Sequence, residues 1–227
     1  MSRNNINDIN SLPEITKLTG DYETDIKYLS NYIDNLTFFL NDTLENIIQN
    51  VAEKNLWNDV RVSATAVKTG GSAPGFGSFG SSGNLKTYLF SSSSDEEVHF
   101  NIQMPHGVKL GTKIYPHVHW APTTGDAGTV CWKLEYEWAN VKSDNSSDYT
   151  FGAPSTIDGT DTTNSTAWEH FATELDEINI DFNLSSMLVC RLYRDTSEDT
   201  YGADAALLEF DIHVLLDSIG SKERYNK

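Results

Sequence analysis

The sequence predicts a mainly β protein, an antiparallel jelly-roll β-sandwich preceded by an N-terminal coiled-coil helix. Three observations support this prediction. Large apolar residues recur every three or four positions up to Val51, which is a helical period. After Trp57 apolar and polar residues alternate, which is the period of a half-buried strand. Segments rich in Gly, Ser and Pro separate the alternating runs, as turns do.

These changes of pattern divide the chain into four segments. We expect a polar arm over residues 1–21, a helical oligomerisation stem over 22–56, a jelly-roll β domain over 57–221 and a short tail over 222–227. A chain of 227 residues has room for one stem and one such domain.

The expected stem carries one narrow apolar seam. An isolated helix with such a seam must bury it, and the regular spacing favours self-association over packing against the chain's own β domain. The residue types suit a parallel dimer and are also compatible with three strands, so the seam leaves both states open. The seam has one stutter at Leu40–Leu44. Its members are Ile26, Leu29, Ile33, Leu36, Leu40, Leu44, Ile47 and Val51.

About eight strands are expected in the β domain, the number found in a jelly roll. In the run 129–141, Trp132, Leu134, Tyr136 and Trp138 share the core phase, and charged residues occupy the other face. In the run 206–217, every second residue from Leu208 onwards is expected to face the core. The other expected strands are 60–68, 86–90, 97–104, 113–121, 166–175 and 187–194.

Three segments are expected to be surface loops. The first, residues 70–84, is rich in Gly and Ser and carries Phe76 and Phe79, which are expected to pack on the domain or on a neighbouring subunit. The other two expected loops are residues 143–164 and 195–204.

The charge balance excludes several classes of partner. The net charge is -17, from 33 acidic and 16 basic residues, and such a surface repels phosphate backbones and anionic membranes. We therefore expect no nucleic-acid partner and no membrane partner. The two cysteines, Cys131 and Cys190, lie in expected strands and are predicted to be buried free thiols.

The candidate metal ligands are histidines. His117 and His119 are two residues apart on one strand and could share a metal, and their spacing from Gly111 resembles the opening of the metal-binding motif of cupins. The glutamate of that motif is replaced by threonine, and its third histidine is missing. The two histidines, like His99 and His213, occupy the polar phase of their strands. We therefore expect no metal and no cofactor, with these imidazoles facing water or a neighbouring subunit.

No pattern predicts catalysis, so we expect no enzyme. Glu135 and Glu137 could mimic the carboxylate pair of a glycoside hydrolase, but their alternation with aromatic residues is typical of a solvated strand face. The tryptophans suggest a sugar-stacking platform, except that three of them share the core phase and are expected to be structural. The five tryptophans are Trp57, Trp120, Trp132, Trp138 and Trp168.

Several segments of the β domain together resemble a family of tailed-bacteriophage virion proteins. The most distinctive of them is Pro-His-Val-His-Trp at residues 116–120. The resemblance implies a virion structural component without enzymatic activity, and it implies a trimer, the usual state of such fibre-like subunits. The similar segments are 57–68, 70–72, 103–107, 115–120, 134–141, 185–191 and 207–213.

The expected function is that of a phage virion structural protein, located in the virion. We expect a trimeric short fibre or decoration subunit of the head, neck or tail that acts by assembly and by binding other virion proteins of the capsid, neck or tail. The alternative is a receptor- or glycan-binding spike domain whose loop over residues 143–164 contacts a host-surface glycan. A cupin-like metalloprotein is a third class.

Overall fold

A computed structural model describes residues 19–52, 56–142 and 148–225, with side chains of the helix described up to residue 48. The chain forms two compact units, residues 1–54 and 55–227. The predicted polar arm lies almost entirely outside the described residues. No helix in the described ranges is long and apolar enough to cross a membrane.

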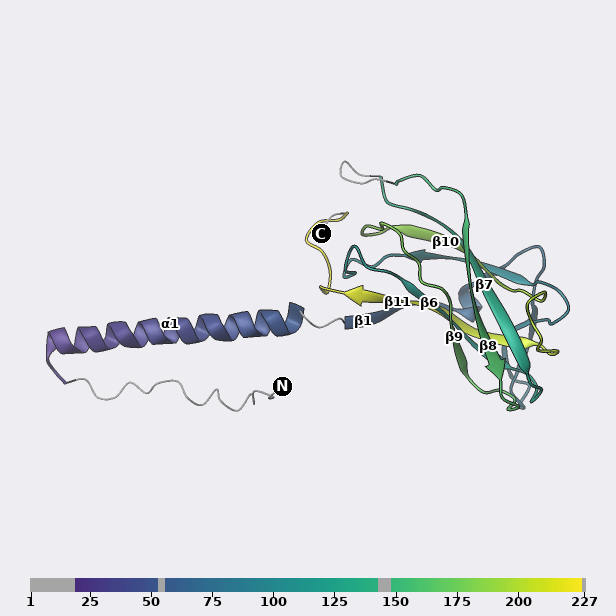
Figure 1. The fold of residues 1–227 in the computed structure, drawn as a ribbon, viewed down its shortest axis with the longest axis horizontal. Coiled ribbons are helices and arrows are strands. Elements are labelled where there is room, and N and C mark those ends of the chain that lie inside the picture. Colours follow the sequence, from purple (N-terminus) through teal and green to yellow (C-terminus); the bar gives the residue numbers. More distant parts are fainter. Residues whose placement is uncertain (1–18, 53–55, 143–147, 226–227) are drawn as a thin grey trace. The chain divides into compact units, whose positions relative to one another are not determined.

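The first unit contains one helix, α1, over Tyr22–Ala52 (Figure 1). Asp21 precedes it, and its carboxylate accepts a hydrogen bond from the Thr24 backbone N–H at 3.3 Å. Asp25 in the first turn accepts one from the Thr19 backbone N–H at 2.8 Å. Carboxylates at this end satisfy free N–H groups and oppose the helix dipole. The helix predicted for the stem is confirmed, whereas its pairing into a coiled coil remains a proposal.

The second unit contains two antiparallel sheets. The first sheet has the order β3-β4-β11-β6-β9, with β1 also paired to β11, and the second has the order β2-β5-β10-β7-β8. The strands are β1 Leu56–Ser63, β2 Lys68–Thr69, β3 Gly75–Phe79, β4 Leu85–Phe90, β5 Glu97–Gln103, β6 Tyr115–Pro122, β7 Gly128–Ala139, β8 Ser155–Thr163, β9 Phe171–Glu174, β10 Met187–Arg194 and β11 Ala205–Leu216. A short 3-10 turn, η2, spans Ala64–Ala66.

The eight strands from β4 to β11 pair as a long antiparallel ribbon folded back on itself. β4 pairs with β11, β5 with β10, β6 with β9, and β7 with β8. In each pair, one strand belongs to the first half of this series, β4 to β7, and its partner belongs to the second half, β8 to β11. Wrapping such a ribbon into two sheets gives the jelly-roll arrangement, so the predicted mainly β sandwich is present in the second unit.

The core lies between the two sheets. Phe90 of the first sheet contacts Trp132 of the second with ring centroids 5.0 Å apart, and Trp120 lies 6.3 Å from Trp132 across the same layer. Phe100 and Phe210 meet at 4.8 Å. Trp132 and Leu134 are fully buried and Tyr136 is 8% exposed, which confirms the predicted inward phase of β7.

Two strands lie where loops were predicted. β3 falls in the Gly/Ser tract and β8 falls in the predicted loop 143–164. Both are terminal strands of a sheet, where one partner strand suffices and few large apolar residues are needed. The prediction that the aromatic residues of the tract pack down is confirmed, because Phe76 contacts Tyr88 at 5.2 Å and Phe79 contacts Trp168 at 5.0 Å.

The predicted inward position of Leu208 is wrong. The pairing of β11 with β6 shifts register between Leu207 and Glu209, and a β-bulge of this kind reverses the side-chain phase. Leu207 is therefore buried in the core, and Leu208 is turned to the outer face. Beyond the bulge the predicted phase resumes at Phe210.

Candidate binding site on the first sheet

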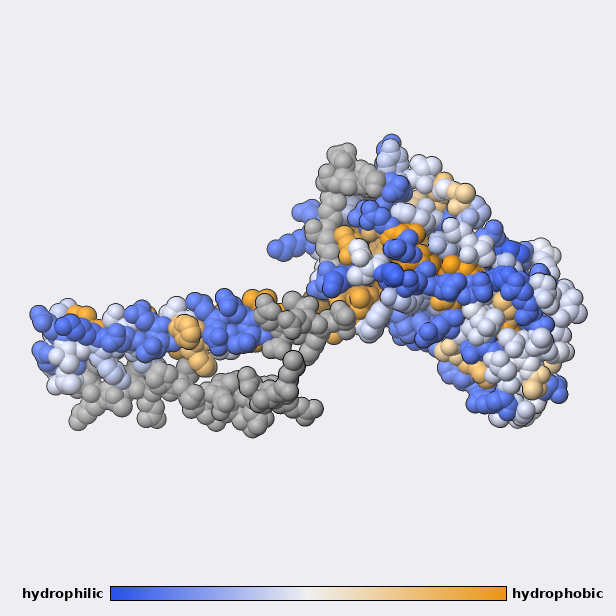
Figure 2. Space-filling model, viewed as in Figure 1, coloured by the Kyte–Doolittle hydropathy of each residue, from blue (hydrophilic) through white to orange (hydrophobic). Residues whose placement is uncertain are grey.

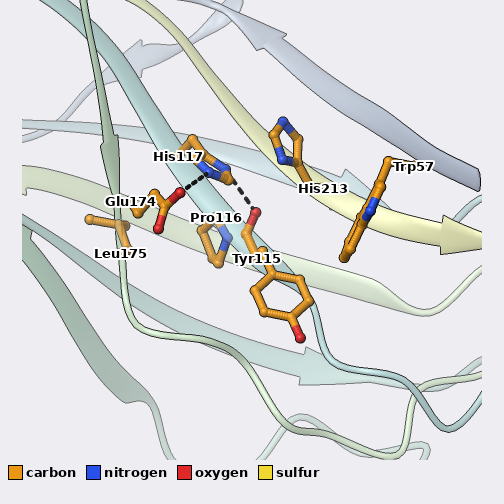
Figure 3. Close-up of a pocket in the computed structure, with 7 residues that line it drawn as sticks. All are labelled: Trp57, Tyr115, Pro116, His117, Glu174, Leu175 and His213. Carbon is orange, nitrogen blue, oxygen red and sulfur yellow. Dashed lines mark hydrogen bonds and ion pairs between the residues drawn. The ribbon is translucent and has the colours of Figure 1, made fainter. Parts of the chain in front are cut away.

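A pocket of about 520 Å³ opens on the outer face of the first sheet, where β1, β11, β6 and β9 lie side by side (Figure 3). Its volume falls within the range of about 300–1,000 Å³ that is common for small-molecule sites. The lining residues are Trp57, Tyr115, Pro116, His117, Glu174, Leu175 and His213.

The strand register determines which side chains meet there. Asp211 of β11 is paired with His117 of β6, which is paired in turn with Glu174 of β9. One step along, Asp59 of β1 is paired with His213, which is paired with Tyr115. Directly paired residues point to the same face with Cβ atoms about 5 Å apart. Strands distant in the sequence thus bring polar and aromatic side chains together.

An aromatic pair forms one side of the pocket. The Trp57 ring meets the Tyr115 ring edge to face at 5.4 Å, and it lies 6.4 Å from the His213 ring (Figure 3). Trp57 remains 54% exposed. A large aromatic face thus stays in contact with water, where a ligand with apolar faces can cover it.

Imidazoles form the floor of the pocket. The rings of His117 and His213 lie 4.1 Å apart. His117 Nδ1 lies 3.0 Å from the Tyr115 carbonyl oxygen, and its Nε2 lies 3.7 Å from the Glu174 carboxylate. His213 Nε2 lies 3.1 Å from an Asp59 carboxylate oxygen. The Glu174 side chain is 84% exposed and can therefore move towards a ligand.

A second hollow of about 310 Å³ continues the site along β1 and β11. In it, His119 Nδ1 lies 2.8 Å from His170 Nε2. His119 Nε2 lies 3.2 Å from Asp211 Oδ2, and Arg61 is paired with Glu209. The lining residues are Asp59, Arg61, His119, His170, Leu208, Glu209 and Asp211. We call the two hollows together the first-sheet groove.

Asp211 is the least satisfied polar group of this groove. Its side chain is 5% exposed, and its Oδ1 atom is buried without a hydrogen-bond partner among the described residues. His117 Nδ1 lies 3.8 Å from Oδ1, which is too far for a hydrogen bond. A buried carboxylate oxygen without a partner is costly, and native structures contain few of them.

The structure changes the interpretation of the histidines. His117 is only 8% exposed, because the strand pairing sets it beside His213 and Glu174. It therefore faces these residues more than water, and its facing a neighbouring subunit stays a prediction. The His99 side chain is 45% exposed, as expected. His170 was not singled out from the sequence, because only the pairing of β6 with β9 brings it to His119.

The tryptophans separate into two groups. Trp120 and Trp132 are fully buried, and Trp138 is partly buried against the core, as predicted for these three. Trp57 precedes the first expected strand, so the alternation of apolar and polar residues did not assign it to either face of the sheet. Pairing of β1 with β11 places it in the groove.

Both cysteines are buried and free, as predicted. Burial raises the pKa of the Cys131 thiol and of the Cys190 thiol to about 12. The two thiols therefore stay protonated at neutral pH, and only the thiolate form is a nucleophile or a metal ligand.

All eight residues of the predicted oligomerisation seam lie in α1. Those with large exposed side chains are Ile26, Ile33, Leu40, Leu44 and Ile47, which are 47–60% exposed within the single chain. Leu29 and Leu36 are half-buried, and the side chain of Val51 lies outside the described part. Phe38, 74% exposed, is a further apolar residue of α1 that the seam did not include.

The chain matches no family model, and no curated protein sequence matches it. Solved structures similar to it include the CBM36-1 domain of a multidomain xylanase from the hindgut metagenome of Trinervitermes trinervoides, with 12% identity, a TM-score of 0.38, and coverage of 68% of this chain and 96% of that one. Another is an Arthrobacter globiformis T6 isomalto-dextranase complexed with panose, with 16% identity and a TM-score of 0.37, covering 68% of this chain and 23% of that one.

Proposed function

We propose that the second unit is a carbohydrate-binding domain and that the first-sheet groove holds the sugar. The observation that carries this proposal is the exposed Trp57 ring, set edge to face with Tyr115 beside a floor of imidazoles and carboxylates. The domain acts by binding, without a catalytic step.

The groove offers both kinds of contact that a sugar requires. The C–H face of a pyranose is apolar and packs on an aromatic ring, as on Trp57. Sugar hydroxyls both donate and accept hydrogen bonds, and they match carboxylate oxygens and imidazole nitrogens. Glu174 and His213 supply these groups in the first hollow, and Asp59 and His170 supply them in the second. The two adjoining hollows suit more than one sugar unit.

The charge of the groove selects among glycans. Carboxylates line it, while Arg61, the only basic residue other than histidine among the described residues that line it, is already paired with Glu209. The whole chain carries a net charge of -17. A sialylated or uronic-acid glycan would be repelled at low ionic strength. We therefore propose neutral oligosaccharides as the ligand class.

Binding to a panel of neutral and acidic oligosaccharides tests this proposal. Trp57→Ala should weaken binding to the best neutral ligand at least tenfold, because stacking on the ring is lost. Phe76→Ala is the matched control, since Phe76 is 53% exposed and lies outside the groove. The proposal is wrong if no neutral glycan binds, or if both variants lose binding equally.

A second candidate function is assembly, and α1 favours it. Apolar side chains interrupt the mostly hydrophilic surface of this helix (Figure 2), and the exposed seam residues repeat at a spacing that suits self-association. We propose that α1 joins three copies of the chain and that the trimer is a phage virion subunit, a short fibre or decoration of the head, neck or tail. A glycan-binding domain on such a stem would serve attachment to a host surface.

Changing Ile33 and Leu36 to Asp in every chain should dissociate the proposed trimer, because like charges would be buried together. Light scattering of the parent at micromolar concentration should give three times the mass of one chain. Asn35→Asp adds charge outside the seam and is the control. A monomeric parent protein would remove the assembly proposal and leave the glycan proposal standing.

A further inference from the structure

We propose that His117, Asp211 and His213 form a binding site for a divalent first-row transition metal, with Zn²⁺ as the preferred ion. One potential ligand atom from each of the three residues lies within 4.8 Å of the other two. The site would lie in the floor of the first-sheet groove, and its existence does not depend on glycan binding.

The backbone places these three side chains together. Asp211 and His213 are two residues apart on β11 and therefore point to the same face. His117 is the direct partner of Asp211 on β6. The metal set is thus held by two adjacent strands of one sheet, which is more rigid than a set held by loops.

The buried Oδ1 atom of Asp211 is an independent indication of a ligand. It has no hydrogen-bond partner among the described residues, although its side chain is only 5% exposed. A metal ion would neutralise the carboxylate and satisfy this oxygen at once. Two ligand atoms that each lie about 2.1 Å from a tetrahedral zinc ion are about 3.4 Å apart. His117 Nδ1 lies 3.8 Å from Asp211 Oδ1, so a small approach would bring the two atoms to this distance.

The surroundings of the two imidazoles resemble the second layer of a zinc site. Ligating histidines usually hydrogen-bond a carboxylate or a backbone carbonyl through the nitrogen that does not bind metal. His213 has such a partner in Asp59, 3.1 Å from its Nε2, and His117 Nε2 faces the Glu174 carboxylate at 3.7 Å. Metal binding would release His117 Nδ1 from the Tyr115 carbonyl oxygen, 3.0 Å away. A water molecule would complete the coordination.

The choice of ion follows from the donors. Two imidazoles and one carboxylate suit zinc and its neighbours in the first transition row, whereas magnesium and calcium prefer oxygen donors alone. The second His/Cys/Asp/Glu group found in the described residues, Cys131 with Asp158 and Glu198, is a poorer set, since both of its carboxylates are exposed.

This inference revises the expectation drawn from the sequence. The polar strand phase was taken to exclude a metal because a cupin metal lies inside the barrel. Here the polar phase of β6 and β11 is itself largely covered, and His117 and Asp211 are both buried. The site differs from a cupin site in lying outside the sandwich and in drawing its carboxylate from β11.

Titration calorimetry of the untagged full chain, freed of metal with EDTA and dialysed, tests the proposal with Zn²⁺ as the probe. We expect one equivalent to bind. Zinc at about a hundredfold excess over Kd should also raise the Tm by roughly 5–10 °C. Millimolar Mg²⁺ should not compete. Absence of binding, or binding of Mg²⁺ in preference to Zn²⁺, would overturn the proposal.

Variants locate the site. The double change His117→Gln with His213→Gln should weaken zinc binding at least about a hundredfold, and Asp59→Asn should weaken it about ten- to a hundredfold through the lost support of His213. His99→Gln, on the second sheet, is the matched control. Thermal unfolding in EDTA checks that each variant folds, and Asp211→Asn replaces the double variant if that one does not. Retained binding in the folded ligand variants, or equal loss in His99→Gln, contradicts the site.

Discussion

Two buried aspartates, one beside each sheet, differ in how well their surroundings satisfy them. Asp195, at the end of β10, is 7% exposed, and Asp211, on β11, is 4% exposed. Asp195 accepts hydrogen bonds from Lys133 Nζ at 2.6 Å and from the backbone N–H and hydroxyl of Ser197 at 3.0 and 2.6 Å. Asp211 Oδ2 lies 3.2 Å from His119 Nε2, whereas its Oδ1 atom lacks a hydrogen-bond partner among the residues described.

The same contrast extends over the outer faces of the two sheets. On the second sheet Arg191 of β10 bridges Glu97 of β5 and Glu135 of β7, so its charges compensate one another. Glu135 is therefore the partner of an arginine. A hollow also lies on the second sheet, but its lining includes the already paired Arg191 and Glu135. On the first sheet, the lining includes Asp211, whose Oδ1 atom has no hydrogen-bond partner among the described residues. A compensated face contributes to stability, whereas an uncompensated face is where ligands are expected.

The largest expected effect tests whether inner and outer faces are assigned correctly. Trp132→Ala should lower the free energy of unfolding by about 3–5 kcal/mol, because the ring fills the layer between the sheets and its loss leaves a cavity. Trp132 is fully buried and contacts Phe90 and Trp120. Urea denaturation monitored by circular dichroism measures the change.

Glu135→Gln is the control for this substitution, because Glu135 lies on the outer face of the same strand and is half-buried. It should change the free energy of unfolding by less than about 1 kcal/mol. A Trp132→Ala protein that melts within a degree or two of the parent would mean that the two faces have been reversed.

The second effect concerns the satisfied aspartate and depends on pH. The Lys133 ammonium and the Ser197 donors lower the pKa of Asp195 to about 2. The folded pKa lies below the unfolded one, so the carboxylate stabilises the fold above the unfolded pKa, and this contribution is lost as pH falls towards the folded value. Asp195→Asn should therefore lower the free energy of unfolding by about 2 kcal/mol at pH 7.

Denaturation at a series of pH values measures this contribution. The difference between parent and Asp195→Asn should shrink steadily between about pH 5 and pH 2. Ser197→Ala, which removes one hydroxyl donor and leaves Lys133 in place, should give a smaller loss of the same pH dependence. A difference that stays constant down to pH 2 would show that the ion pair does not stabilise the fold.

The alternating strands were predictable because one face of each lies on the core. Trp132, Leu134 and Tyr136 on β7 show this directly, since a shift of one residue would bury charge. The sequence of β8 offered no such signal, because this terminal strand carries small polar residues on both faces, such as Thr162 on one and Thr163 on the other. The bulge at Leu208 was equally invisible, because it exists only in the pairing of β11 with β6.

The groove could be predicted only in part. The spacing of His117 and His119 places them on one face from the sequence alone. Their meeting with Asp211 and His213 requires β11 to lie beside β6, and these strands are separated in the sequence by about half of the domain. Trp57 reaches the same face only through the pairing of β1 with β11. Long-range strand order therefore creates the site, and local pattern supplies only its components.

The smallest expected effect concerns Asp211 and is the most direct test of the comparison between Asp211 and Asp195. In protein freed of metal, Asp211→Asn should leave the Tm within about 2 °C of the parent or raise it. The amide keeps an acceptor for His119 and removes a buried charge whose Oδ1 has no hydrogen-bond partner among the described residues. Thermal unfolding in EDTA at pH 7, beside Asp195→Asn, makes the comparison. If Asp211→Asn were as destabilising as Asp195→Asn, the Asp211 carboxylate would be a structural group. The distinction between the faces of the two sheets would then be lost.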